Sequence, residues 1–260
     1  MTFPINKFIN DINPQSKDLS QASIKELQQI AKQAINNYAT SRGVNIEFNL
    51  SIYTTNIFSL DAFIAQNVIY LPPLYFIDRN QVPFTGPDDK SLNDKDKLQK
   101  FANHLADLSG IQRKKVTWED RMTLRLYLSA MKDVDKSSQA LAFILLHEMG
   151  HSHHQHIHRK FEYANKLSRP KYVILNILTL GIFKRAAIDL QSRHHEKQAD
   201  AFGAEKYAEG GRYLFHTVRK FKAKGFTEKM AYQALCISSL FTHGTYAKRE
   251  SRMKAHIKKL

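Results

Sequence analysis

The spacing of apolar residues changes near residue 43, and the change predicts a helix followed by strands. Between residues 21 and 41, apolar side chains recur every three or four positions, as they do on one face of a helix, and Gly43 is a suitable end for it. These side chains are Ile24, Leu27, Ile30, Ala31 and Ile35. After residue 44, apolar and polar residues alternate with the period of a half-buried strand. The alternating apolar residues are Ile46, Phe48, Leu50 and Ile52.

Two short apolar runs, residues 59–65 and 68–71, flank the polar pair Gln66-Asn67. Short apolar runs on either side of a polar dipeptide are typical of a β-hairpin. Two consecutive prolines follow at once, and proline cannot donate a backbone N–H to a β-ladder. We therefore predict a hairpin that ends at Leu71.

Residues 78–136 are rich in charge and predict amphipathic helices over residues 92–108 and 118–131, with Gly110 between them. Nothing in this segment has the pattern of a catalytic site. We interpret it as a helical insertion that covers the core, and a lid or recognition element is the alternative.

The length and composition of the chain predict a folded domain. It has 260 residues, of which 43% are hydrophobic, and this excludes a chain that is disordered throughout. Residues 1–20 are polar and contain proline, so we expect a loose N-terminal arm, followed by a single domain over residues 21–260. We predict an α+β fold that is predominantly helical, with a small antiparallel or mixed sheet.

The charge of the chain is strongly positive, with 39 Lys and Arg against 24 Asp and Glu, a formal net charge of +15. Such a balance favours an acidic partner, either an anionic membrane surface or an acidic protein, and general solubility is the alternative. Nucleic acid is disfavoured, because the chain has no zinc finger, glycine-rich loop or alternating aromatic and basic stripe. Residues 248–260 predict a basic amphipathic helix.

Cysteine use and hydropathy bear on the compartment. Cys236 is the only cysteine, so no internal disulfide can form. The first residues lack the apolar core of a secretory signal. The longest apolar stretch, residues 172–183, is shorter than the roughly 20 residues that cross a bilayer as a helix, which leaves a buried hairpin or a surface-dipping segment. We expect a soluble, cytoplasmic protein without a transmembrane segment, and leave peripheral membrane association and non-classical export open.

The clearest chemical pattern follows the apolar run at residues 140–146. His147 and His151 are four residues apart, so on a helix both imidazoles can face one metal ion. Glu148 lies about 100° round the helix from His147, near the metal but not bound to it. From there its carboxylate can take a proton from metal-bound water. This pattern favours a zinc hydrolase, and the alternative is a helix that carries two histidines by chance.

We expect this helix to begin at a serine cap, Ser137 or Ser138, and to run past His158. On a continuous helix, His154 and His158 roughly extend the stripe that carries the two motif histidines. They have two interpretations, a second metal site or a polar and solvated helix end, and we favour the helix end.

A catalytic zinc site typically has three protein ligands, so a third must lie elsewhere in the chain. Residues 192–203 offer Glu196 and Asp200, which are four apart and share one face of a predicted helix among small and apolar residues. Glu196 can complete a His-His-Glu site, and Asp200 can accept the free ring N–H of a histidine ligand. His194 and His195 compete with Glu196, and spacing alone does not decide between them.

The pairing of His147-Glu148-x-x-His151 with Glu196-x-x-Ala199-Asp200 resembles the gluzincin family of HtpX and the CAAX prenyl endopeptidase. Members of this family are zinc-dependent endopeptidases. The resemblance covers roughly residues 44–72 and 137–257, and residues 78–136 have no counterpart in it.

Further stretches agree with this family. Residues 61–63 and 68–70 are similar to its strands before the metal helix, and His156 matches a third histidine of several members. Thr242-His243-Gly244 and the later Arg249 resemble its Thr-His-Pro stretch and following arginine, with glycine in place of proline.

The resemblance implies a zincin-like fold with an active-site helix and one Zn²⁺ per chain. His147, His151 and Glu196 would hold the ion, with water as the fourth ligand. Glu148 would act as the base that takes the proton of the water and later delivers it to the leaving amine. Asp200 would orient the first metal histidine.

The same family pattern makes His243 and Arg249 candidate catalytic donors to the oxyanion of the reaction. The alternative is that both are structural and hold the C-terminal helix in place. The strand near residues 61–65 is a candidate edge on which an extended peptide substrate can pair.

From these patterns we expect a zinc-dependent endopeptidase that cuts internal bonds of a polypeptide. One alternative is an inactive zinc protein that acts as a chaperone or binding module through its basic surface, although such a protein has no need of Glu148. Another is a latent enzyme whose site is closed by His104 or by a neighbouring loop.

Overall fold

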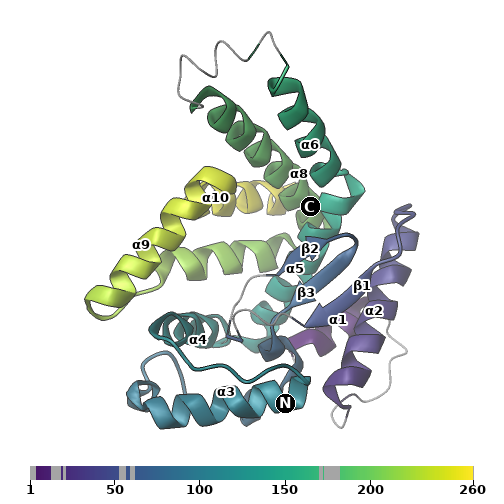
Figure 1. The fold of residues 1–260 in the computed structure, drawn as a ribbon. Coiled ribbons are helices and arrows are strands. Elements are labelled where there is room, and N and C mark those ends of the chain that lie inside the picture. The colour runs from purple at the N-terminus through teal and green to yellow at the C-terminus, as the bar shows by residue number, and fades with distance from the viewer. Residues whose placement is uncertain are drawn as a thin grey trace.

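The structure is a computed structural model that describes residues 4–12, 19, 22–52, 57–58, 62–169, 172 and 182–259. Within them the fold is predominantly helical with a small mixed sheet, which confirms the α+β prediction at that level (Figure 1). The helices are α1 (Pro4–Ile12), α2 (Ile24–Ser41), α3 (Lys95–Ser109), α4 (Trp118–Ala130), α5 (Val134–His153), α6 (His156–Leu167), α8 (Ile182–Lys220), α9 (Gly225–Thr242) and α10 (Tyr246–Ile257). The strands are β1 (Asn49–Ile52), β2 (Phe63–Ala65) and β3 (Val68–Leu71).

The sheet has the order β1-β3-β2, with β3 parallel to β1 and antiparallel to β2. The predicted hairpin is confirmed, and its turn residues Gln66 and Asn67 have φ values of 48° and 64°. Positive φ at both central positions is what a type I′ turn requires. β2 is one of the two edge strands, and it packs against α5, the helix that carries the two motif histidines.

The N-terminal segment differs from the loose arm that its composition predicts. Residues 4–12 form α1, and the side chains of Ile5, Phe8 and Ile9 are fully buried. The helix packs against α5. These residues and Ile12 have the spacing of one helical face, a signal that the polar residues between them mask.

The helices over residues 24–41 and 95–130 confirm the predictions to within a few residues at each end. Ser23 and Glu26 form a capping box at the start of α2, and Thr117 and Asp120 form one at the start of α4. Gly110 ends α3 with a φ of 65°. The segment at 78–136 is therefore helical as expected.

The bounds predicted for α5 are wrong at both ends. Its N-cap is Asp133, and Ser137 and Ser138 lie inside the helix, where their hydroxyls donate to backbone carbonyls of preceding residues. At the other end, Gln155 has a φ of 54° and separates α5 from α6. His158 therefore belongs to a different helix from the motif histidines.

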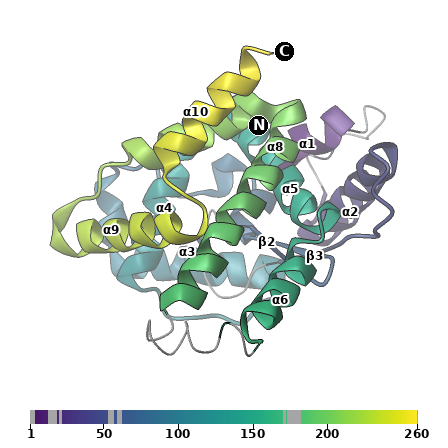
Figure 2. The ribbon, with the colours of Figure 1, turned by 90° about the horizontal axis from the view of Figure 1, so that it is seen from above.

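α5 lies at the centre of the fold and packs most extensively against α8 (Figures 1 and 2). Small residues permit this close approach. A Cβ atom on Gly150 would lie 3.0 Å from the Cα of Ala199, and one on Gly210 would collide with the backbone oxygen of Gln139. The two helices that carry the candidate ligands are therefore held at close range.

α4 and α9 pack against each other and against α8 (Figures 1 and 2). The predicted buried hairpin or surface-dipping segment at 172–183 lies mostly outside the described residues. Among the helices of the described part of the chain, none is long and apolar enough to cross a bilayer.

Candidate metal centre

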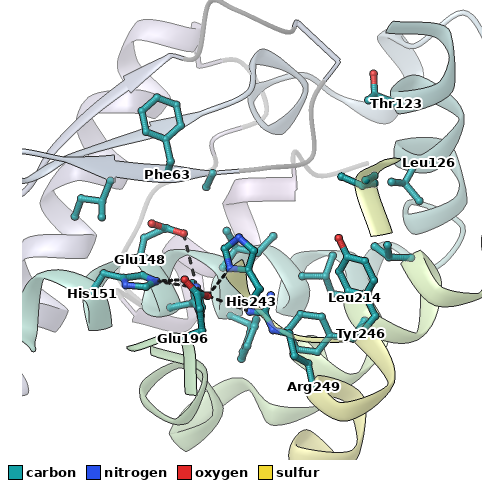
Figure 3. Close-up of a pocket in the computed structure, with 18 of the residues that line it drawn as sticks. Phe63, Thr123, Leu126, Glu148, His151, Glu196, Leu214, His243, Tyr246 and Arg249 are labelled. Atoms are coloured by element: carbon teal, nitrogen blue, oxygen red, sulfur yellow. Dashed lines mark hydrogen bonds and ion pairs between the residues drawn. The ribbon is translucent and has the colours of Figure 1, made fainter. Parts of the chain in front are cut away.

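Two histidines from α5 and one glutamate from α8 bring their ligand atoms together (Figure 3). His147 and His151 lie one helical turn apart, and their Nε2 atoms are 3.2 Å from each other. The Glu196 carboxylate lies 3.3 Å from each of these nitrogens, through Oε2 for His147 and Oε1 for His151. The structure thus joins the three predicted ligands.

These spacings are those of ligands around a single ion. Zinc ligands of this kind lie about 2.0–2.2 Å from the metal, so tetrahedral geometry separates them by roughly 3.3–3.6 Å. Glu196 Oε2 is buried and has no hydrogen bond of normal geometry among the described residues. Two imidazoles and a carboxylate with an unshared lone pair fit a bound metal ion, and the group can hold one.

Asp200, one turn after Glu196 on α8, supports the first histidine from behind. Its Oδ1 lies 3.2 Å from His147 Nδ1, on the side of the ring away from the metal centre. Burial alone lowers the pKa of His147, but the nearby carboxylates of Asp200 and Glu196 outweigh it and raise the pKa to about 10. The carboxylates thus stabilise a positive charge here, which a bound cation can supply in place of the ring proton.

Asp200 is itself held by two arginines of α10. Arg249 binds it through two nitrogens, at 2.5 and 3.1 Å, and Arg252 binds it at 2.5 Å. Burial raises the pKa of Asp200, but the Arg249 charge and the contact with His147 outweigh it and hold the pKa well below its usual range. Arg249 is buried, and these contacts support the structural alternative for it. It also lines the cavity beside the metal centre, so its catalytic role stays a prediction.

The second histidine is supported by a different chain of contacts. His151 Nδ1 lies 2.9 Å from His156 Nδ1, and His156 Nε2 lies 3.0 Å from Gln198 Oε1. Burial lowers the pKa of His156 to about 3, so this ring is neutral. Since the amide oxygen of Gln198 accepts, His156 Nε2 carries the hydrogen and its Nδ1 accepts from His151. His151 Nε2 is then left with its lone pair directed at the metal centre.

Glu148 lies beside this group without belonging to it. Its Oε1 is 4.0 Å from His147 Nε2, and its side chain is buried. Burial, with a smaller contribution from the Glu196 charge, raises the pKa of Glu148 to about 7, against the lowering effect of His147, Arg249 and a backbone hydrogen bond from Ile64 in β2. A carboxylate with such a pKa can both accept and release a proton near neutral pH.

His243 comes from the turn between α9 and α10 and is half-exposed. Its Nδ1 lies 2.7 Å from Glu196 Oε2, without the geometry of a hydrogen bond. This places the ring at the edge of the metal centre, on the side that is open to the neighbouring cavity (Figure 3). His243 is therefore brought to the site as predicted.

A cavity of about 520 Å³ opens beside the metal centre. Glu148, His151 and Glu196 lie at one end of it, and Thr123 and Leu126 of α4 lie at the other (Figure 3). The segment at 78–136 therefore contributes a wall of the site. The sequence favoured a cover for the core, and this position agrees better with the alternative, a lid or recognition element.

Other histidines are not part of the group that can hold a metal within the described residues. The ring of His195 stacks on His156 with an interplanar angle of 6°, so their ring nitrogens point past each other. His194 and His158 are exposed. His104 is exposed on α3 and does not line the cavity.

Three supporting contacts were not predicted: those of His156, Gln198 and Arg252. His156 could be matched by position, but its contact with His151 depends on the break at Gln155, which no glycine or proline announces. For Gln198, the sequence indicated only that it lies two residues after the predicted ligand Glu196 on the same helix, which does not predict a contact with His156.

No protein-family model, curated protein or solved structure matches the chain. What the protein does must therefore be inferred from its own side chains.

Proposed function

We propose that the protein is a zinc-dependent endopeptidase that hydrolyses internal bonds of a polypeptide, with a zincin-like fold related to the gluzincins. One observation carries the proposal. The ligand atoms of His147, His151 and Glu196 converge at tetrahedral spacing, with a buried Glu148 beside them and a cavity in front. A structural metal site needs neither the carboxylate nor the cavity.

The residues have separate tasks in this reaction. Zinc bound by the three ligands would supply a polarised water and a positive charge for the substrate carbonyl. Glu148 takes the proton of the attacking water and passes it to the leaving amine, which its pKa near 7 allows. Asp200 and His156 keep the two imidazoles in the orientation that leaves each Nε2 free to bind.

The edge strand supports a polypeptide as the substrate. Among the described strands, β2 pairs with β3 alone, and Phe63 and Ile64 line the cavity. An extended chain can pair with such an edge by backbone hydrogen bonds, and this places one of its peptide bonds near Glu148. Sequence-independent backbone contacts suit an enzyme that cuts inside a chain.

The test is zinc analysis combined with casein cleavage by the wild type, Glu148→Gln and Glu162→Gln. Glu162 is an exposed glutamate of α6, so the third protein carries the same chemical change away from the site. We expect one zinc per chain in all three proteins, and cleavage by the wild type and Glu162→Gln alone. Zinc without casein cleavage in any protein would contradict the proposed activity, and absence of zinc would contradict the site.

A further inference from the structure

The cavity beside the metal centre has two ends of different chemistry. The charged residues that line it are Glu148, Glu196 and Arg249, and each belongs to the group around the metal ligands or lies within 4.0 Å of it. The other end carries no charged side chain among its lining residues. A substrate group that enters this end therefore loses its contact with water and finds no charged partner there.

Side chains of α5, α8 and α9 form the apolar wall. Ile144, Leu214 and Leu235 line the cavity and are only partly buried, although residues of this type usually lie in a core. Their exposed atoms face the cavity, so apolar surface is available for a ligand to cover. The volume of about 520 Å³ lies within the range of pockets that bind small molecules.

α4 closes the far end of the cavity, where Thr123 and Leu126 line it (Figure 3). This helix is fixed to α9 by a buried ion pair between Arg125 and Glu228. Arg125 also donates to the backbone oxygen of Pro87 at 2.8 Å. The far wall is therefore rigid, and its distance from the metal centre sets the size of the group that fits.

We propose that this cavity is the specificity pocket of the enzyme and that it binds a large apolar side chain, leucine, methionine or phenylalanine, next to the cleaved bond. The inference rests on the proposed peptidase function. A charged side chain in this pocket would be buried without a partner, which is strongly unfavourable. An alanine would leave most of the apolar wall uncovered.

The experiment uses short peptides, capped at both ends and varied at one central position, with cleavage located by mass spectrometry. We expect the zinc-loaded wild type to cleave beside leucine, methionine or phenylalanine roughly 10- to 200-fold faster than beside alanine, and not beside aspartate. Leu214→Phe should shift the preference towards smaller side chains, and Leu214→Ala towards tryptophan. Thr123→Leu narrows the far end by a second route and should act like Leu214→Phe.

The matched control is Leu190→Ala, the same substitution in α8, before its kink at Tyr207, at a side chain that is 64% exposed and outside the cavity. Its preference should equal that of the wild type. Cleavage that ignores the varied residue, or equal effects of the Leu214 and Leu190 substitutions, would overturn the pocket while leaving the peptidase intact.

A second measurement separates the pocket from the activity. The leucine and aspartate peptides are titrated calorimetrically into the zinc-loaded Glu148→Gln protein, which binds without cleaving. Tighter binding of the leucine peptide, lost in a protein that also carries Leu214→Phe, supports the pocket. This holds even if the wild type cleaves nothing, and then only the proposed activity fails. Equal or undetectable binding of both peptides overturns the pocket.

Discussion

Asp200 and Glu228 are two buried carboxylates, 1% and 2% exposed, that arginines hold in place. Asp200 binds Arg249 and Arg252 and also faces the ring of His147. Glu228 binds Arg125 and Arg121 and accepts the backbone N–H of Lys224. The first carboxylate joins α8 to α10, and the second joins α9 to α4.

The difference lies in what each carboxylate touches besides its arginines. The partners of Glu228 are two arginines, which stay charged, and a backbone N–H, so none of them has to gain or lose a proton. Asp200 is also directed at an imidazole whose other nitrogen belongs to the metal centre. A buried ion pair of either kind resists disruption, but only the pair that contains Asp200 can influence the binding of a metal.

The largest expected effect comes from removing the carboxylate of Glu228, which joins α9 to α4. Glu228→Ala leaves Arg125 buried without its carboxylate, and we expect the free energy of unfolding to fall by about 3–5 kcal/mol. Urea denaturation followed by circular dichroism measures the change. A loss below about 1 kcal/mol would show that water or another group already satisfies Arg125.

Removing one negative charge from each cluster sharpens the comparison. Asp200→Asn should weaken zinc binding by roughly 10- to 100-fold, because the histidine ligand loses its orienting carboxylate. Glu228→Gln is the matched change and should lower stability while leaving zinc affinity unchanged. Competition with a chromophoric chelator gives both affinities, and equal zinc affinities in the two variants would remove the distinction.

The group that supports His151 is the neutral ring of His156, so its loss should lower zinc affinity less than the loss of the charged Asp200. His156→Phe keeps an aromatic ring against His195 but removes the contact with His151, and we expect zinc affinity to fall by about tenfold. The same substitution at the exposed His158 is the control and should have no effect. If the two variants bind zinc equally well, His156 does not orient His151.

The smallest effect concerns a third carboxylate, that of Glu250. Its partners are the side chains of His216, Arg219 and Lys254, which are partly exposed to solvent. Burial raises the pKa of Glu250, but Lys254, His216 and Arg219 outweigh it and lower the pKa to about 2. Its stabilising contribution is therefore full above the ordinary pKa of 4.5 and is lost as pH falls from there towards 2.

We expect the wild type to exceed Glu250→Gln in unfolding free energy by about 1 kcal/mol at pH 6, because exposed partners are screened by solvent. The difference should shrink through pH 4 and vanish near pH 2. Thermal unfolding of both proteins across this range measures it. A difference that is constant with pH would show that the charge of Glu250 does not contribute.

The sequence predicts the elements and residues whose signals are local. The i, i+4 spacing predicts the shared face of His147 and His151, and also that of Glu196 and Asp200. Two short apolar runs around the polar pair Gln66-Asn67 predict the hairpin, although glutamine does not favour the positive φ that Gln66 adopts there. These signals did not decide whether Glu196 or a neighbouring histidine is the third ligand. The fold brings Glu196 to both imidazoles.

Features that depend on tertiary contacts could not be predicted. Gln155 adopts a left-handed conformation that its residue type does not favour, so the separation of α5 from α6 had no local signal. The buried role of Arg249 depends on Asp200, far away in sequence. α4 becomes a wall of the cavity through tertiary contacts, among them the Arg125–Glu228 pair that joins it to α9.

Anomalous diffraction at the zinc edge, from crystals of the zinc-loaded protein, tests the metal centre most directly. We expect one strong peak per chain, bonded to Nε2 of His147, to Nε2 of His151 and to the Glu196 carboxylate, with Glu148 close by but not bonded. A peak on other histidines, or no peak at these three residues, would contradict the metal centre and the function built on it.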